Sequence, residues 1–169
     1  MNKTVKKVFL GLSIALPFLI YCVYYYSMMI RNAPYRFSDF DSIVFQYGNG
    51  DSLINKYDSK TGDYQYVDVH NKLIKTHLHL NDNELLYLHR KAAELGFWNF
   101  PDDELNDSDK IKGINPPHYL IEYNYKHKSK KVMFDAAFQG DPKLIDANQQ
   151  LIKVIQQTLD DADSGNKSN

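Results

Sequence analysis

The hydrophobic pattern of the chain begins with one long uncharged segment. The 23 consecutive residues from Val8 to Ile30 carry no charge. As an α-helix this segment would be about 34 Å long, which exceeds a hydrocarbon core of roughly 30 Å. Pro17 lies within it, and a lipid-embedded helix accommodates such a kink. The pattern predicts a transmembrane signal anchor over residues 8–30.

Aromatic and charged residues at the two ends of this segment predict its orientation. Tyrosines gather in its second half, at residues 21 and 24–26, and such amphipathic rings favour the level of the lipid headgroups. Three lysines precede the segment, whereas Arg31 and Arg36 follow it. The positive-inside rule therefore predicts a cytoplasmic tip of residues 1–7 and an extracytoplasmic C-terminal part at the cell membrane.

Two other interpretations of the same segment stay open. A lysine-rich start followed by apolar residues is typical of a cleavable secretory signal peptide, but no small-residue cleavage motif follows here. Leu19-Ile20-Tyr21-Cys22 has the outline of a bacterial lipobox, although Tyr21 stands where a small residue is expected. We expect an uncleaved anchor, with cleavage or lipidation of Cys22 as the alternatives.

Apolar residues that alternate with polar ones predict an antiparallel sheet of about five to six strands. Gly48-Asn49-Gly50 is a hairpin turn signal between the first two strands, and no parallel βαβ repeat is visible. The predicted strands cover residues 43–47, 53–57, 64–69, 73–79, 119–125 and 132–134.

Two amphipathic helices complete the predicted fold. In the first, Asn81 and Glu84 have the spacing of a capping box, and Gly96 can end the helix in the left-handed conformation. The second begins at Asp141-Pro142 and carries an apolar stripe up to Leu159. The fold class is α+β: an N-terminal transmembrane helix followed by an antiparallel sheet packed against two helices.

Charge and composition divide the chain further. From Phe37 onward there are 15 basic and 21 acidic residues, a net charge of −6, which argues against binding to nucleic acid. We expect a tether over residues 31–40, an α+β extracytoplasmic domain over 41–160 and a disordered polar tail over 161–169.

Two histidines are the candidate metal ligands. His77 and His79 lie on one face of a predicted strand, because side chains alternate with period two. Neutral imidazole is a common zinc ligand, but a site needs a third and usually a fourth ligand. The alternative interpretation is a solvent-exposed face, with Leu78 and Leu80 pointing inward.

One dense basic run is the candidate binding surface. Lys126, Lys128, Lys130 and Lys131 lie on the tip of a predicted hairpin. Such a tip can be a solubilising turn that protects the sheet edge. Its functional interpretation is contact with an anionic partner, either an envelope component or a protein.

Motifs of catalysis are missing from the sequence. There is no Gly-x-Ser-x-Gly elbow and no phosphate-binding glycine loop, and Cys22 is the only cysteine. We therefore expect a protein that is not an enzyme and that carries no cofactor.

A resemblance adds to this interpretation. The capped helix is followed by Glu-Leu-Gly-Phe-Trp-Asn-Phe-Pro at residues 94–101 and later by the lysine-rich hairpin. Over residues 81–102 and 119–134 the chain resembles small uncharacterised exported bacterial proteins that are membrane-anchored or lipidated. The resemblance implies location and fold, because such families carry no assigned activity.

The combined expectation is a single-pass membrane protein with a non-catalytic extracytoplasmic domain. That domain would be a binding module or an envelope-associated accessory module. The alternative is a metal-binding domain or a metal-dependent enzyme centred on His77 and His79.

Overall fold

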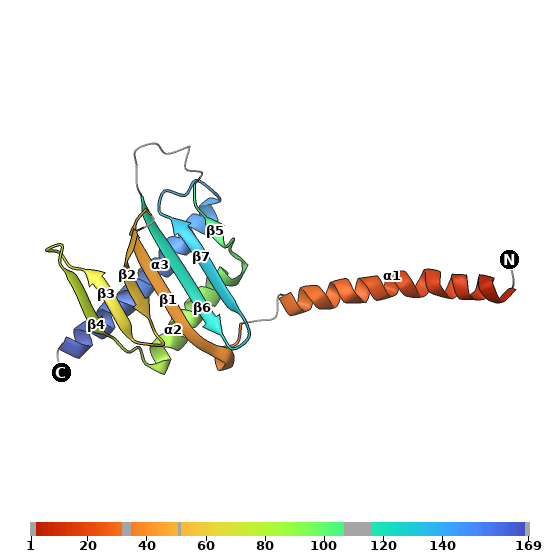
Figure 1. The fold of residues 1–169 in the computed structure, drawn as a ribbon, viewed down its shortest axis with the longest axis horizontal. Coiled ribbons are helices and arrows are strands. Elements are labelled where there is room, and N and C mark those ends of the chain that lie inside the picture. The colour runs from red at the N-terminus through yellow and green to blue at the C-terminus, as the bar shows by residue number, and fades with distance from the viewer. Residues whose placement is uncertain (1–2, 32–34, 51, 107–115, 168–169) are drawn as a thin grey trace. The chain divides into compact units, whose positions relative to one another are not determined.

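The chain divides into two compact units, and each is described by itself. The computed structural model describes residues 3–31, 35–50, 52–106 and 116–167 (Figure 1). One unit comprises the chain up to Pro34, and the other begins at Tyr35.

The first unit is a single helix, α1 (Lys3–Arg31), of 29 residues with Pro17 inside it. Its described apolar side chains, such as Ile14 and Phe18, are exposed. Within the described part of the chain, no helix combines the length and the apolar content that crossing a membrane requires, so the transmembrane helix expected over residues 8–30 is not found among these residues.

The second unit is built on one seven-stranded sheet with the order β4-β3-β2-β1-β6-β7-β5. The strands are β1 (Phe40–Asn49), β2 (Ser52–Asp58), β3 (Asp63–Val67), β4 (Leu73–His77), β5 (Asp103–Glu104), β6 (Pro117–Tyr125) and β7 (Ser129–Asp135). All neighbouring strands are antiparallel except β5 and β7, which pair in parallel. The sheet is therefore mixed and has seven strands. The prediction of five to six antiparallel strands is wrong because it did not include β5. That strand has only two residues, too few to produce an alternating pattern.

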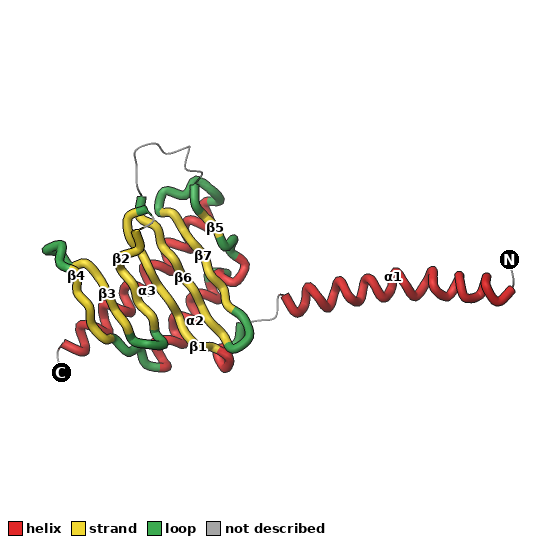
Figure 2. Tube along the Cα trace, viewed as in Figure 1, coloured by secondary structure: helices red, strands yellow, loops and turns green. Residues whose placement is uncertain are grey.

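Two helices, α2 (Asp82–Glu94) and α3 (Pro142–Lys167), cover the same face of the sheet (Figure 2). The predicted capping box of α2 is confirmed: Asn81 accepts the N–H groups of Asn83 and Glu84, and Glu84 accepts that of Asn81. Gly96 has a φ of 78°, a conformation that suits glycine, and a 3-10 turn (Phe97–Asn99) follows it. The α+β class is thus confirmed.

The core lies between the sheet and these helices. Fully buried aromatic residues dominate its centre, and the Tyr123 hydroxyl donates to the Leu88 carbonyl at 3.1 Å. Leu78 and Leu80 are buried, as their positions in the sequence predict.

The described structure of the domain begins before residue 41 and continues past residue 160. The tether was expected to reach residue 40, but Tyr35 already stacks on Trp98 with ring centroids 4.5 Å apart, and a 3-10 turn (Phe37–Asp39) leads into β1. At the other end α3 continues to Lys167, so residues 161–167 are not a disordered tail. Contacts with the sheet explain this extension, because Ala162 packs against the core and the Tyr66 hydroxyl lies 3.5 Å from Asp163 Oδ2.

Candidate ligand-binding pocket

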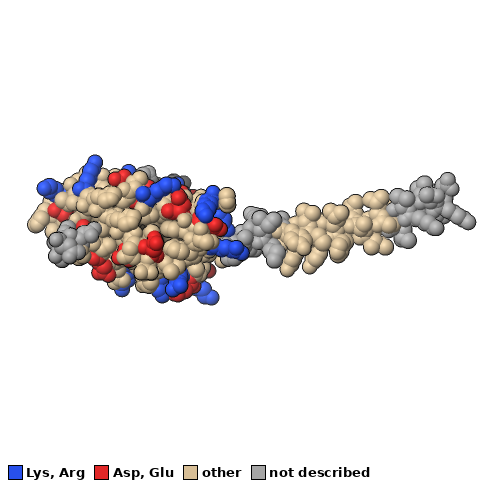
Figure 3. All heavy atoms as spheres, turned by 90° about the horizontal axis from the view of Figure 1, so that it is seen from below, with Lys and Arg blue, Asp and Glu red and all other residues tan. Residues whose placement is uncertain are grey.

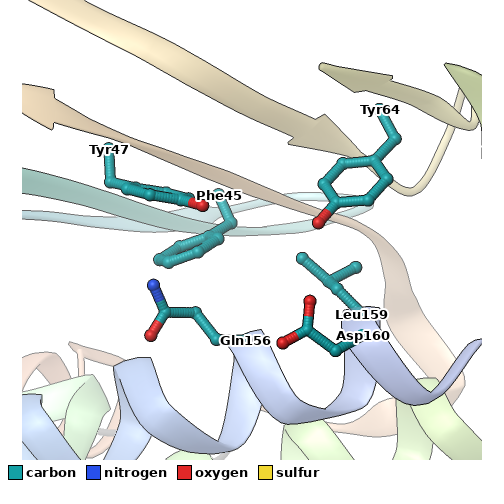
Figure 4. Close-up of a pocket in the computed structure, with 6 residues that line it drawn as sticks. All are labelled: Phe45, Tyr47, Tyr64, Gln156, Leu159 and Asp160. Carbon is teal, nitrogen blue, oxygen red and sulfur yellow. The ribbon is translucent and has the colours of Figure 1, made fainter. Parts of the chain in front are cut away.

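A cavity of about 230 Å³ lies between the sheet and the C-terminal half of α3 (Figure 4). We call it the tyrosine pocket. Aromatic residues come from the strands, and amide, carboxylate and aliphatic residues come from the helix. The lining residues are Phe45, Tyr47, Tyr64, Gln156, Leu159 and Asp160.

The lining residues share a face of their strand or helix because their spacing matches the period of that element. Phe45 and Tyr47 are two residues apart on β1, so both point toward the helices. Gln156 and Asp160 are four residues apart on α3 and therefore lie one above the other on the same helix face. Tyr64 on β3 closes the pocket from the neighbouring side (Figure 4).

Ring contacts hold the aromatic wall in place. The ring centroids of Phe45 and Tyr47 are 5.3 Å apart, and Tyr47 stacks on Tyr119 at 5.9 Å. Tyr64 packs against Tyr66 at 4.8 Å. Because each ring is supported by another, the faces that line the pocket are fixed before any ligand arrives.

The electrostatics of the pocket keep its phenols protonated. Burial raises the pKa of Tyr47, and the charge of Asp160 raises it further. Burial also raises the pKa of Tyr64, with smaller contributions from Tyr47 and from the Asp160 and Asp163 carboxylates. At neutral pH the site therefore offers neutral hydroxyl groups beside negative carboxylates.

The polar groups of the pocket face one shared space. The Tyr64 hydroxyl and the Asp160 carboxylate face the same space, which the Gln156 amide also borders (Figure 4). Serine, cysteine, histidine and lysine are not among the six lining residues. The pocket thus supplies hydrogen-bond acceptors and aromatic faces.

A second hollow shares the Tyr47 side chain with this pocket. It has a volume of about 430 Å³ and lies toward the β1–β2 turn. Asn55 supports its wall by donating to the Tyr47 carbonyl at 3.1 Å and by accepting the Val67 N–H at 2.9 Å.

The predicted metal ligands do not share a regular strand face. β4 ends at His77, whose ring packs over Gly62, and exposed His79 lies in the connection to α2. Across the described ranges of the chain, no three histidine, cysteine or acidic residues gather in a way that could hold a metal ion.

The basic hairpin is not one surface. Lys130 is only 9% exposed, and its ammonium group donates to the Phe100 carbonyl and, at 2.5 Å, to Asp102 Oδ1. Its inclusion among the surface lysines was wrong, because period two on β7 places residue 130 on the inner face with Val132 and Phe134. Lys131 is exposed and pairs across the ladder with Glu122.

The other hairpin lysines also have neighbours in the domain. Lys126 Nζ lies 3.8 Å from Asp39 Oδ1, and Lys128 Nζ lies 3.8 Å from the centre of the Tyr35 ring. Basic and acidic side chains are interspersed on the face of the domain that Figure 3 presents. The Asp39 carboxylate offsets part of the charge of Lys126, whereas the neutral Tyr35 ring leaves the charge of Lys128 in place.

A second polar region, which the sequence did not reveal, is closed off in the core. Glu104 on β5 is fully buried, and its Oε2 accepts from the Asn148 side chain of α3 at 2.6 Å. Glu104 Oε1 and Asn148 Oδ1 have no hydrogen-bond partner among the described residues. Burial raises the pKa of Glu104 to about 7, although the Asn148 hydrogen bond and the charge of Lys130 oppose the rise.

Comparison of the chain with protein-family models and with curated proteins gives no match.

Proposed function

We propose that this protein is a single-pass membrane protein whose extracytoplasmic domain is a non-catalytic binding module. The observation that carries the binding role is the tyrosine pocket, in which fixed aromatic faces, neutral hydroxyls and a carboxylate surround one cavity. Half of the lining residues are aromatic, and a concave site that combines aromatic faces with a few convergent polar groups can hold a small ligand.

The anchoring role rests on the first unit. Its support is the sequence, in which the 23 uncharged residues form one uninterrupted segment that lies within α1. The helices of the described residues do not by themselves meet the length and apolar content of a membrane span, so the anchor is proposed from this uncharged segment and its charged flanks. Three lysines before the segment and two arginines after it favour a cytoplasmic N-terminus. The resemblance to small exported bacterial proteins supports the same placement at the cell membrane.

Fractionation of cells tests the anchor. The full chain should stay in the membrane pellet after alkaline carbonate washing and leave it only with detergent. A chain that begins at Tyr35 retains the whole core and should remain in the supernatant. Release of the full chain by carbonate would contradict the anchor.

A matched pair of variants distinguishes insertion into the membrane from non-specific association with it. Ile14→Arg places a charge inside the uncharged segment, where the cost on insertion scales is up to about 2.5–3.5 kcal/mol, the value for the centre of a helix. Ile14→Leu keeps the segment apolar. We expect only Ile14→Arg to increase the carbonate-soluble fraction, and equal fractions for both variants would contradict membrane insertion.

Topology and processing need two further measurements. A reporter fused after Asn169 should be active only in the extracytoplasmic compartment, and activity in the cytoplasm would reverse the orientation. Mass spectrometry of the membrane-extracted protein should show an intact N-terminal segment. A mature chain that begins after Ser27, or a diacylated Cys22, would replace the anchor by one of its alternatives.

A further inference from the structure

We propose that the tyrosine pocket binds the ammonium group of a small organic cation. This inference rests on the proposed binding function and names the class of ligand. Its starting point is charge: Asp160 lines the pocket, and none of the six lining residues is basic. The part of the chain from Phe37 onward has a net charge of −6, so a cation is also favoured at long range.

The aromatic wall favours the same ligand. Tyr47 and Tyr64 border the cavity beside Phe45, and the face of an aromatic ring attracts a cation through its quadrupole. Tyr64 is only 7% exposed, so a cation beside its ring would be partly shielded from water. Shielding strengthens a cation–π contact compared with one on an exposed surface.

Hydrogen bonding distinguishes an ammonium group from other cations. An ammonium group has three N–H donors and needs three acceptors. The pocket supplies three acceptors, the two oxygens of the Asp160 carboxylate and the Tyr64 hydroxyl oxygen, whereas the Gln156 amide turns its nitrogen toward the rings (Figure 4). Because burial and nearby negative charges raise the pKa of Tyr64, this hydroxyl stays neutral and its oxygen can accept while its proton points elsewhere.

The volume of the pocket limits the size of the ligand. Pockets for drug-sized molecules have volumes of about 300–1,000 Å³, and this one has about 230 Å³. It therefore suits a short aliphatic amine better than a large ligand. The aliphatic part would lie against Leu159 and Phe45, which contribute the apolar part of the lining.

The test titrates butylammonium into the purified full chain in a non-ionic detergent, with 1-butanol as the neutral ligand of similar shape. Side-chain NMR signals of Tyr47, Tyr64 and Gln156 report on the pocket. Butylammonium should shift these signals and reach saturation, whereas 1-butanol should not. Equal shifts with both compounds, or no saturation with butylammonium, would overturn the inference.

Matched variants locate the site. Asp160→Asn removes one charge at the pocket and should weaken binding by about tenfold, the effect of losing one charged hydrogen bond. Asp161→Asn removes the same charge from the next residue of α3, which is exposed and does not line the pocket, and should leave the affinity unchanged. Tyr64→Phe keeps the ring and should weaken binding less than Asp160→Asn. Equal losses for Asp160→Asn and Asp161→Asn would overturn the inference, because only general attraction would then remain.

The two proposals fail separately. Release of the full chain by carbonate together with saturable butylammonium binding would contradict the anchor alone. Retention in the membrane without butylammonium binding would overturn the ligand class and leave the anchor in place.

Discussion

Helix α3 borders two polar regions that meet solvent in different ways. Near its start, Asn148 is fully buried and holds the equally buried Glu104. Near its end, exposed Asp160 lines the tyrosine pocket, which is open to ligands. The same helix therefore contributes to a closed polar pair at one end and to an open polar cavity at the other.

The difference shows what decides the role of a polar group. In the closed region two oxygen atoms, Glu104 Oε1 and Asn148 Oδ1, have no partner among the described residues, and a buried polar group without a partner is costly. A proton on Glu104 would remove its buried charge and so relieve part of that cost. In the open region solvent can satisfy the polar groups until a ligand replaces it, so this region can change partners without unfolding.

The largest expected effect is a pH dependence of stability that comes from Glu104. Its pKa is raised from 4.5 in the unfolded chain to about 7 in the fold, so between these values the folded state binds more protons. The free energy of unfolding should therefore be greatest below pH 4.5 as far as this group is concerned, and should fall by about 3 kcal/mol as the pH rises through 7. Urea unfolding at pH 5 and pH 8 measures the change.

Glu104→Gln provides the decisive variant for this effect. The new amide is neutral at every pH, as the protonated acid is, so the pH dependence should shrink and the variant should be the more stable protein at pH 8. Asp103→Asn, at the exposed neighbour on β5, should unfold like the parent chain. A Glu104→Gln variant with the full pH dependence would show that Glu104 is not its source.

The next effect concerns Lys130 and its exposed neighbour. Lys130→Met keeps most of the apolar stem but removes the donor to Phe100 and Asp102, and should cost about 2 kcal/mol. It should also raise the pKa of Glu104 further, because the charge of Lys130 lowers it. Lys131→Met lies on the exposed face and should change the free energy of unfolding by less than about 0.5 kcal/mol. Equal costs for the two variants would place Lys130 at the surface after all.

The smallest effect compares two hydroxyl groups. The Tyr123 hydroxyl is buried and donates to the Leu88 carbonyl, so Tyr123→Phe should cost about 1 kcal/mol. The Tyr64 hydroxyl faces the pocket, so Tyr64→Phe should cost less than about 0.5 kcal/mol in the absence of ligand. Thermal unfolding of both variants measures the difference. If Tyr64→Phe were the more costly change, the pocket would be part of the core instead of an open site.

Local signals in the sequence predicted much of the fold. The capping box at Asn81 and Glu84 depends on residues three apart, and Gly96 ends its helix by its own conformational freedom. Leu78 and Leu80 were placed inward by simple alternation. Each of these features is decided within a few residues of the chain.

Features that depend on distant partners could not be predicted in the same way. β5 exists because Asp103 and Glu104 pair with β7, and the last turns of α3 are held by contacts with β3. The acidic neighbours of Glu104 make residues 102–104 resemble a solvated turn, and no local signal marks the one carboxylate that is buried. The burial of Lys130 could not be predicted for a related reason, since composition does not show that Lys130 and Lys131 point to opposite faces.

The tyrosine pocket depends both on local signals and on partners that are distant in the sequence. Its strand residues, Tyr47 and Tyr64, were assigned to strands, and tyrosine in place of an aliphatic residue on an inner face was the one available signal. The partners Gln156 and Asp160 lie more than 90 residues away along the chain, so their meeting depends on how α3 crosses the sheet. No spacing in the sequence encodes that crossing.

The most direct test of the contrast between the two regions uses two side-chain amides of the same helix. A ¹⁵N-¹H spectrum of the protein reports on Gln156 in the open pocket and on Asn148 in the closed pair. Butylammonium at constant pH should shift the Gln156 signal and leave the Asn148 signal in place. Raising the pH from 5 to 8 without ligand should shift the Asn148 signal with a midpoint near 7, because its acceptor Glu104 loses a proton there. A spectrum in which both amides respond to both changes, or in which neither responds, would contradict the division into a closed and an open polar region.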